Sequence, residues 1–555
     1  MKSRVQSYEF LVLVLIVACS SSLLAQSAVG NRRQLNRTSI LADKTTWLDV
    51  NRIKLPLSSL GGLYNSYAYS SWDGWDIQDG DAMIFDQGLW ITGKRNGSVG
   101  CLPYLWYSPY SPGPIISGRP AIQVRPQDAA RYRSYEITAG DLPEWNPDIH
   151  AWPSDLGAPI DVTGRPRISG DQMVWMVYNG LDTTIPAWPP DFFRGVPSRT
   201  LLPVEVHQAV YAHFGELRDT SIWANTVFFE WSVYNRGSDP LDSVYLTLWT
   251  DPDFINAFFT FPAVDTNAQT AYCWYGLDSS YGSIGYTLLY GPIVPSPGST
   301  AVTFGVNRPG MRNIPLSGFW AFNDDSFPDS SDYGPPYSLG TAWNVVRGLN
   351  QRGGAIIDPS TGKPTRFPYS GDPITKSGDI YPFHYTGGGG GFMMTTGPCS
   401  IAPGDSQWIS IALIPSVKRD GVDAINRMRS NARYLRNLQY DSLTARKPRR
   451  TIPIDPLPAF NFPGSFELHQ NYPNPFNAGT TIPFDLPEQS HVHMEVFDLL
   501  GRSVVTLADQ VFERGTRGVT WFPVGATGVY IVRMRAESME SSRTWSGART
   551  MLLLR

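Results

Sequence analysis

Acidic side chains are the residues of this chain that could serve as the catalytic carboxyl groups of a glycoside hydrolase. Glycosidases need two carboxyl groups held about 5 to 10 Å apart across a cleft. The G-x-S-x-G turn of serine hydrolases and the H-E-x-x-H helix of zinc proteases are both absent from the 555 residues. We therefore predict no catalytic residue and lean against an enzyme. The alternative is a glycan-acting hydrolase with an unidentified carboxylate pair, for which the sequence offers Glu144, Glu205, Glu216, Glu230 and Asp251 without pairing them.

Two acidic clusters have the composition of a calcium-binding loop. Asp251 and Asp253 flank a proline at the expected end of a strand. Calcium takes six to eight oxygen ligands, which loop carboxylates and backbone carbonyls commonly supply. Asp and Pro also end strands and form turns without an ion, so both interpretations stay open. Calcium at Asp251 and Asp253 is the one cofactor predicted; the neighbouring acids are Asp265 and Asp278, and the second cluster is Asn323, Asp324, Asp325, Asp329 and Asp332.

The histidines and cysteines do not have the spacing of a metal centre. His207 and His213 share a strand face but would lie about 20 Å apart along it. His491 and His493 share a face at close range, yet the sequence offers them no further ligand. There is no C-x-x-C pair, so no structural zinc site is predicted. At most one disulfide and one free thiol are expected among Cys101, Cys273 and Cys399.

Strands must position these residues, because the body of the chain has the pattern of β-structure. Aromatic and β-branched residues alternate through residues 204–249, which predicts three strands. The turn NRGSDP (Asn235 to Pro240) predicts an immunoglobulin-like hairpin, and APGD before QWISIAL (residues 402–413) predicts a second one. The glycine run Gly387 to Gly391 lacks the Lys-Ser/Thr ending of a phosphate loop and is expected to be a plain loop. The predicted fold class is all-β, with several immunoglobulin-like β-sandwich domains.

One amphipathic helix is expected after these strands. Apolar residues recur every three to four positions from Gly421 to Tyr440, and arginines occupy the other face. We expect the helix to pack on the sandwich with a solvated basic face, rather than to bind nucleic acid or lipid. A proline-rich segment, residues 451–465, then forms a semi-rigid linker. The body divides at the sequence level into a β-rich region, residues 26–200, and a sandwich-like region with the trailing helix, residues 201–450.

Tryptophan is abundant in the first of these regions. Gly80 to Gly93 predicts a hairpin and Ala121 to Arg125 a short strand. Exposed aromatic rings can bind sugars by stacking, which would make an extracellular glycan a partner, but we favour tryptophans that fill cores. The residues concerned are Trp72, Trp75, Trp90, Trp106, Trp145, Trp152, Trp175 and Trp188.

Residues 1–25 have the pattern of an export signal. A basic start is followed by the apolar run Phe10 to Ala18, which is about half the length that spans a membrane, so we predict a cleaved signal peptide. Cleavage before Cys19 would leave a lipid on that residue, and cleavage after Ala25 would not; we favour the second. No other segment is apolar enough to span a membrane. A net charge of −4 and a pI near 6.0 give no reason to expect nucleic acid as a partner.

The last ninety or so residues, 466–555, read as a separate small antiparallel β-sandwich. Short strand-like runs are divided by Gly, Pro and Asp at regular intervals. The module opens on the sequence NYPNPFN, whose two prolines fix φ and push the preceding residues toward extended conformations. The motif residues are Asn471, Tyr472, Pro473, Asn474, Pro475, Phe476 and Asn477.

This module resembles the type A C-terminal sorting domain of the type IX secretion system of Bacteroidetes-type bacteria. The matching elements are NYPNPFN, the strand TTIPFDLPEQSHVHMEVFDLLGRSV, the strand GVYIVRMRA and the closing TMLLLR, while WFPVGAT (residues 521–527) departs from the usual Asp/Gly-rich turn. The body also resembles large, uncharacterised extracellular proteins with the same tail, through segments such as GDQMVWMVYN, WTDPD and IDPSTGKPTRFPYSGDP. The resemblance implies export to the cell surface or the medium, with the type IX machinery as partner. The body would then be structural, adhesive or ligand-binding.

Overall fold

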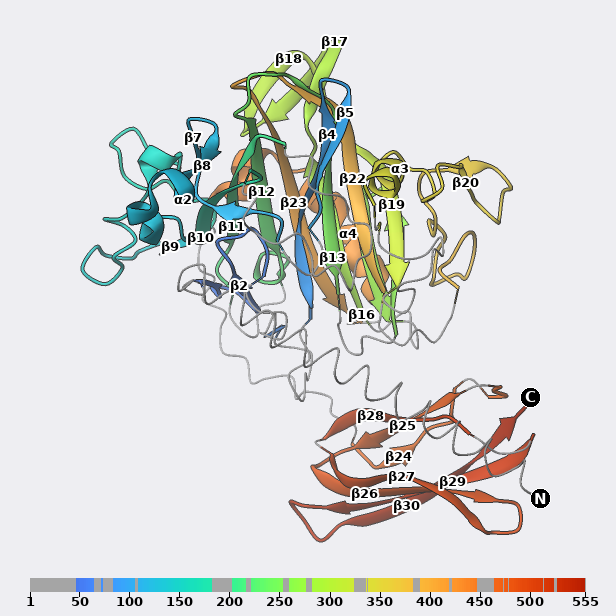
Figure 1. Ribbon diagram of the computed structural model, residues 1–555. Coiled ribbons are helices and arrows are strands. Elements are labelled where there is room, and N and C mark those ends of the chain that lie inside the picture. Colours follow the sequence, from blue (N-terminus) through green and yellow to red (C-terminus); the bar gives the residue numbers. More distant parts are fainter. Residues whose placement is uncertain are drawn as a thin grey trace, which may run out of the picture. The chain divides into compact units, whose positions relative to one another are not determined.

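Antiparallel strands make up most of the protein, in agreement with the predicted all-β class (Figure 1). The chain divides into two compact units, Met1–Pro448 and Arg449–Arg555, which we call the body and the C-terminal unit. The computed structural model describes residues 46–554 except 64–70, 73–82, 105–107, 182–201, 216–220, 253–258, 276–281, 324–335, 337, 383–389, 419–421, 447–463, 473, 478, 513 and 524–526. The expected signal peptide and the linker at residues 451–463 lie outside the described residues.

The larger sheet of the body has nine strands. Its centre is formed by strands whose apolar and polar residues alternate, as the sequence of residues 204–249 predicted. The strands follow the order β14 (Thr260–Asp265), β15 (Thr270–Tyr275), β16 (Gly282–Tyr290), β23 (Ser406–Val417), β12 (Val227–Asn235), β11 (Val204–Ala212), β10 (Gln172–Asn179) and β6 (Ser111–Pro112), and β9 (Tyr135–Thr138) also pairs with β10.

A five-stranded sheet forms the second layer. Its order is β19 (Leu316–Asn323), β22 (Gly390–Ile401), β13 (Leu241–Asp251), β4 (Asp86–Arg95) and β5 (Ser98–Leu102). Strands from both sides of residue 200 pair within each sheet, for example β4 with β13 and β10 with β11. The two sequence regions 26–200 and 201–450 therefore share one sandwich.

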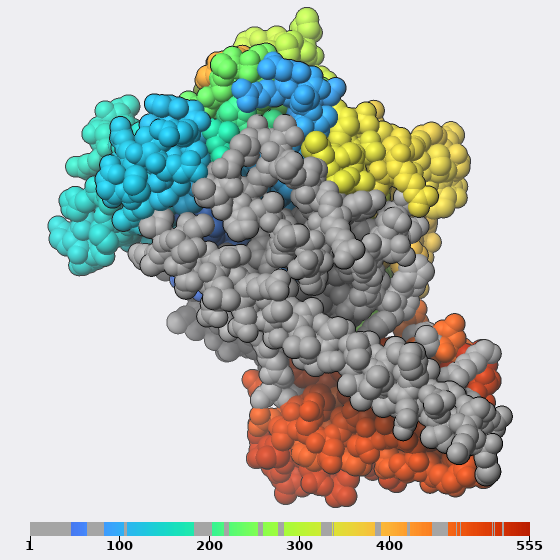
Figure 2. All heavy atoms as spheres, viewed as in Figure 1, coloured from blue at the N-terminus to red at the C-terminus, as the bar shows by residue number. Residues whose placement is uncertain are grey.

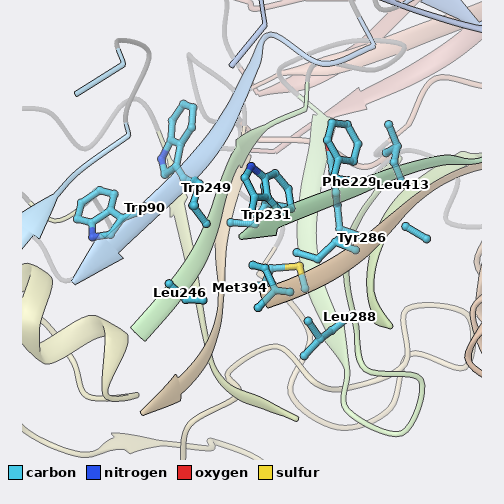
Figure 3. Close-up of a cluster of buried hydrophobic side chains, with 14 of the residues drawn as sticks. Trp90, Phe229, Trp231, Leu246, Trp249, Tyr286, Leu288, Met394 and Leu413 are labelled. Carbon is cyan, nitrogen blue, oxygen red and sulfur yellow. The ribbon is translucent and has the colours of Figure 1, made fainter. Parts of the chain in front are cut away.

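The core of the body lies between these two sheets (Figure 3). Trp231 and Phe229 project from one face of β12 and are buried in this core. Trp90 and Trp249 are also buried, but on the other face of the smaller sheet, because their neighbours in sequence on the strands, such as Thr250, face Tyr286. The ring of Tyr286 on β16 lies 5.9 Å from that of Phe392 on β22, and its hydroxyl donates a hydrogen bond to Gln87 on β4. Large aromatic side chains thus fill the space between layers, which is the usual consequence of one inward face on each strand.

Both predicted hairpins of the body are instead arches that cross from one sheet to the other. The turn after Asn235 joins β12 in the nine-stranded sheet to β13 in the five-stranded sheet, and the turn at residues 402–405 joins β22 to β23 in the reverse direction. The arches hydrogen-bond to each other, because Asn235 N donates to Asp405 O and Gly404 N donates to Asn235 O. The buried Asn235 amide also donates to the carbonyl of Ile401. This polar contact supports the crossing where a hairpin would have continued the ladder.

Three local predictions in the body were wrong. The described part of Gly80 to Gly93 is a single strand, β4, and its hairpin partner is β5, across a turn in which Asn96 and Gly97 have φ of 50° and 76°. Residues 121–124 form a short helix, α2 (Ala121–Val124), because Arg125 N donates to Ala121 O. Gly390 and Gly391 begin β22, where a Cβ on Gly391 would lie 2.3 Å from the Phe322 ring. Close packing, and not flexibility, requires glycine there.

The predicted helix over 421–440 is two helices. α4 (Ala424–Arg436) covers part of the nine-stranded sheet beside β16 and β23, with Met428 against Gly285. Gln439 is extended, with φ −70° and ψ 151°, and it occupies the N-cap position of the separate α5 (Tyr440–Thr444) without a side-chain cap hydrogen bond. Ile425, Met428 and Leu435 are buried as the periodicity predicted, whereas Val422 is 42% exposed.

Smaller elements surround the sandwich. The segment from β6 to β10 (blue to cyan) and the segment after α3 (Leu339–Val346, yellow) lie on opposite flanks of the body in Figure 2. The hairpin of β17 (Ile293–Thr303) and β18 (Val306–Asn313) projects from one end. The remaining elements are β1 (Thr46–Leu48), β2 (Ile53–Leu57), β3 (Ser71–Trp72), β7 (Ile115–Ile116), β8 (Arg119–Pro120), α3 (Leu339–Val346), β20 (Ile356–Ile357), β21 (Pro364–Thr365) and the 3-10 turns η2 (Pro126–Arg131), η3 (Ser154–Leu156) and η4 (Trp223–Asn225).

The C-terminal unit is a small antiparallel sandwich with its own core. A three-stranded sheet consists of β24 (Glu467–Leu468), β25 (Thr480–Leu486) and β28 (Gly515–Trp521). A four-stranded sheet follows the order β27 (Ser503–Phe512), β26 (Ser490–Asp498), β29 (Gly528–Ser538) and β30 (Thr544–Leu553). Strict alternation in β26 buries Val492, Met494 and Val496, as predicted. Every described residue of this core belongs to the C-terminal unit.

Candidate functional site

The NYPNPFN motif lies along the last strand of the C-terminal unit. Phe476 N donates to Leu552 O at 2.9 Å, and Leu554 N donates to Phe476 O at 2.7 Å, which forms a parallel bridge to Leu553. The Asn474 side chain accepts from Leu552 N at 2.8 Å and donates to Thr550 O at 3.2 Å. The motif therefore holds the end of β30 with backbone and side-chain hydrogen bonds, a contact we call the β30 clamp.

The other end of the motif is fixed to β25. Tyr472 and Thr481 exchange two backbone hydrogen bonds of 2.8 and 3.0 Å. Asn471 is buried, and its amide donates to the Thr480 hydroxyl at 2.8 Å. The Phe476 ring is 3% exposed and packs 5.7 Å from that of Trp521, whereas Tyr472 is 55% exposed. The motif thus has buried residues that contact three strands, β25, β28 and β30, and one exposed aromatic ring, that of Tyr472. Pro473 lies outside the described residues.

The acidic residues considered for calcium are dispersed. Asp251 ends β13, is 2% exposed and pairs in register with the equally buried Asp86 of β4. Among the described residues it belongs to no group of three potential ligands. Asp253, Asp278, Asp324, Asp325, Asp329 and Asp332 lie outside the described residues, as does the side chain of Asn323.

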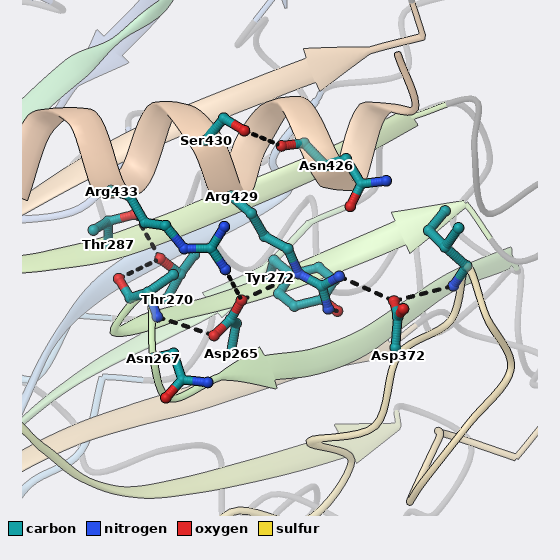
Figure 4. A network of polar contacts seen from close by, with 12 residues as sticks. Asp265, Asn267, Thr270, Tyr272, Thr287, Asp372, Asn426, Arg429, Ser430 and Arg433 are labelled. Atoms are coloured by element: carbon teal, nitrogen blue, oxygen red, sulfur yellow. Dashed lines mark hydrogen bonds and ion pairs between the residues drawn. The ribbon is translucent and has the colours of Figure 1, made fainter. Parts of the chain in front are cut away.

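Asp265 pairs with arginine instead (Figure 4). Its carboxylate lies 3.2 Å from Arg429 Nε and 3.5 Å from Arg433 Nη2, and Arg429 also contacts Asp372 at 2.9 Å. Arg429 is only 13% exposed, and its guanidinium donates to the hydroxyl of Tyr272 at 3.1 Å. The predicted solvated basic face of the helix is therefore wrong at Arg429, which attaches α4 to the sheet.

Two glutamates on the outer face of the nine-stranded sheet have opposite electrostatic environments. Burial would raise the pKa of Glu205, but hydrogen bonds from His207, Arg236 and the Ile115 N–H outweigh it and lower that pKa to about 2. Burial raises the pKa of Glu230 to about 7, although the hydroxyls of Tyr440 and Tyr211 donate to it at 3.1 and 3.3 Å.

These two carboxyl groups do not form a glycosidase pair. Glu205 lies opposite Tyr234, whereas Glu230 lies opposite Ala209, four residues further along β11. At about 3.4 Å per residue the two positions stand about 14 Å apart along the strand, beyond the roughly 5 to 10 Å that separates the carboxyl groups of a glycosidase. Of the other acids considered, Glu144 is exposed and Glu216 lies outside the described residues.

Two histidines of the body contact hydrogen-bonding groups in the fold. His207 contacts Glu205 at 2.9 Å between the rings of Trp175 and Tyr234. His213 is fully buried, with Nε2 2.6 Å from the carbonyl of Leu443. In the C-terminal unit, His491 and His493 share one carboxylate, Asp509, at 3.4 and 3.5 Å.

His469, which the sequence did not single out, lies in the one three-ligand group found among the described residues. The other two members of the group are Glu467 and Asp485. Glu467 and His469 are spaced i, i+2, which places both on one face of a strand. That spacing was visible in the sequence. The contribution of Asp485 was not, because it depends on the register between β24 and β25.

The tryptophans of the body are mostly structural where they are described. Trp90, Trp152 and Trp175 are buried, as we favoured, while Trp145 is 77% exposed. Nothing is described of the side chains of Trp72, Trp75, Trp106 and Trp188. Cys101, Cys273 and Cys399 are buried free thiols.

Comparison with protein-family models gives no match, and comparison with curated proteins gives none either. Among solved structures, CopC from Methylosinus trichosporium OB3b is 19% identical, covering 16% of this chain and 93% of CopC, with a TM-score of 0.14. A polysaccharide lyase is 8% identical, covering 63% of this chain and 34% of the lyase, with a TM-score of 0.19. TM-scores this low assign neither a shared fold nor an activity. No helix among the described residues has the length and apolar character needed to cross a membrane.

Proposed function

We propose that the protein is cargo of a type IX secretion system, exported through its C-terminal unit to the cell surface or the medium. The observation that supports this best is the NYPNPFN motif, which resembles the start of a type A sorting domain and which forms the β30 clamp in a unit with its own core. A sorting signal must fold independently of the cargo to which it is attached. The separate core of residues 466–553 is suited to that requirement.

In this proposal the body is a structural, adhesive or ligand-binding module. Several of its described acids are committed to internal partners, such as Glu205 to Arg236 and Asp265 to Arg429. Trp145, 77% exposed, offers an aromatic surface to an extracellular partner such as a glycan. A glycan-acting hydrolase is the alternative, and it would need a carboxylate pair other than Glu205 with Glu230.

The test is secretion of the full chain by a bacterium that has the type IX machinery. The chain with residues 466–555 deleted is expected to stay in the periplasm, whereas the wild type reaches the surface or the medium. Mass spectrometry of both ends of the exported protein should show loss of the first ~25 residues, as for a cleaved signal peptide. Export of the deleted chain at the wild-type level would contradict the proposal.

A point variant separates recognition from folding. Tyr472 is half exposed, so Tyr472→Ala should leave the unit folded while reducing export if the machinery reads the motif. Leu500, 77% exposed at the turn after β26, provides the control, because Leu500→Ala alters a solvated apolar residue remote from the motif in sequence. Equal export of both variants, each with wild-type melting behaviour, would argue that the ring of Tyr472 is not read.

A further inference from the structure

Three potential metal ligands converge at the first strand of the C-terminal unit. β24 pairs with β25 so that Glu467 lies directly opposite Asp485. His469 continues the same pairing, because its N–H donates to Pro483 O at 2.9 Å. Residues two apart on a strand face the same side, so Glu467 and His469 share a face with Asp485.

The side chains are already close to one another. His469 Nε2 lies 2.8 Å from Asp485 Oδ2, and His469 Nδ1 lies 3.7 Å from Glu467 Oε1. One ligand atom from each of the three residues lies within 4.8 Å of the others. Ligands of a tetrahedral zinc ion at about 2.1 Å stand roughly 3.4 Å apart, so the widest gap needs to close by at most about 1.4 Å. Glu467, whose side chain is 53% exposed, has the freedom to do this.

The charges at this position favour a cation. Two carboxylates directly opposite each other on neighbouring strands repel. A single imidazole can add at most one positive charge between them, whereas a divalent ion adds two. The carboxylates of Glu467 and Asp485 therefore gain more from a bound metal ion than from His469 alone.

We propose that Glu467, His469 and Asp485 form a binding site for a divalent transition-metal ion, with Zn²⁺ as the representative. One imidazole nitrogen with two carboxylate oxygens is a donor set that zinc accepts, and calcium, which prefers oxygen alone, is less suited to it. Three protein ligands leave a fourth position for water. The bound ion joins β24 to β25 and so fixes the beginning of the C-terminal unit.

The His491, His493 and Asp509 cluster makes this site testable against a control within the same unit. This control cluster has two imidazoles and one carboxylate on neighbouring strands. Its three residues do not form a group whose ligand atoms all lie within 4.8 Å of one another. His469→Ala and His491→Ala each remove one partly exposed histidine, and each leaves the core of the unit unchanged.

The experiment is titration of the metal-free full-length protein with Zn²⁺, followed by calorimetry and by competition with a chromogenic chelator. The wild type and His491→Ala should bind one zinc equivalent more than His469→Ala, and Zn²⁺ should raise the melting temperature of the C-terminal unit only where that equivalent binds. Asp485→Asn should lose the same equivalent. Melting in chelator shows whether each variant is folded, and Glu467→Gln, at an exposed position, serves if His469→Ala does not fold.

Two outcomes would overturn the proposal. One is a His469→Ala variant that binds as many equivalents as the wild type with the same affinity. The other is a wild type that binds no zinc, or whose zinc is lost in His491→Ala and kept in His469→Ala.

Discussion

Replacing Glu230 by glutamine should make the body more resistant to unfolding at neutral and alkaline pH. The Glu230 carboxyl is 6% exposed on the central strand β12, and burial raises its pKa from the ordinary 4.5 to about 7. The folded state therefore holds this proton more tightly than the unfolded state. Glutamine keeps the acceptor and donor groups that can meet the hydroxyls of Tyr211 and Tyr440, but it carries no charge at any pH.

The sign and size follow from linkage. A raised folded-state pKa contributes stability that is fully present below about pH 4.5 and is lost as the pH rises through 7. A shift of some 2.5 units corresponds to about 3 kcal/mol. The free energy of unfolding of Glu230→Gln minus that of the wild type should thus increase by about 3 kcal/mol between pH 4.5 and pH 8, because other titrating groups cancel in the difference.

The assay is urea unfolding of the full chain at a series of pH values, in which the transition of the body is followed. Glu205→Gln is the matched control, because its folded-state pKa is lowered to about 2. That variant should lose stability relative to the wild type as the pH rises from 2 to 4.5, a range in which the difference for Glu230→Gln should change little. A stability difference for Glu230→Gln that does not change between pH 4.5 and 8 would refute the reasoning.

Three further predictions concern the clamp, the helix and the thiols. Asn474→Ala removes two hydrogen bonds to β30 and should destabilise the C-terminal unit by about 1–2 kcal/mol. Calorimetry should show that the unfolding transition of the body does not change. An altered body transition would contradict the independence of the two units. Asp265→Asn deprives the partly buried Arg429 of one anionic partner and should lower the stability of the body by about 1.5–3 kcal/mol in urea unfolding. No loss would mean that Asp372 suffices. Burial raises the pKa of Cys101 and Cys399 to about 12. Iodoacetamide at pH 8 should therefore modify none of the buried thiols Cys101, Cys273 and Cys399 before unfolding and all three in urea, as peptide mapping would show.

Alternation in the sequence predicted the strands of the body but not how they connect. β12 and β13 have the pattern of a hairpin, yet they belong to different sheets because their turn meets a second arch at Asp405. A hairpin and an arch leave the same alternation in the two strands, so only contacts distant in sequence distinguish them. The hairpin of β4 and β5 was predictable, since Asn96-Gly97 is the strongest short signal for such a turn.

The same limit applies to the polar residues. The apolar stripe of α4 was correct, but helical period alone does not show that Arg429 meets Asp265 and Asp372 from separate segments. Glu230 was one acid among many until its strand was seen to lie beneath α5, where Tyr440 covers it. The site at His469 likewise depends on strand register. Residue types were visible in the sequence, whereas burial and long-range partners were not.

The β30 clamp also determines how the C-terminal unit responds to mechanical load. The motif and the end of β30 run parallel, and a force applied between the body and the final residues pulls the motif toward its N-terminal side and β30 toward its C-terminal side. The hydrogen bonds at Phe476 and Asn474 are then loaded together in shear, instead of being opened one after another as in unzipping. A chain stretched between an anchored C-terminal end and its body would therefore load several of these hydrogen bonds at once.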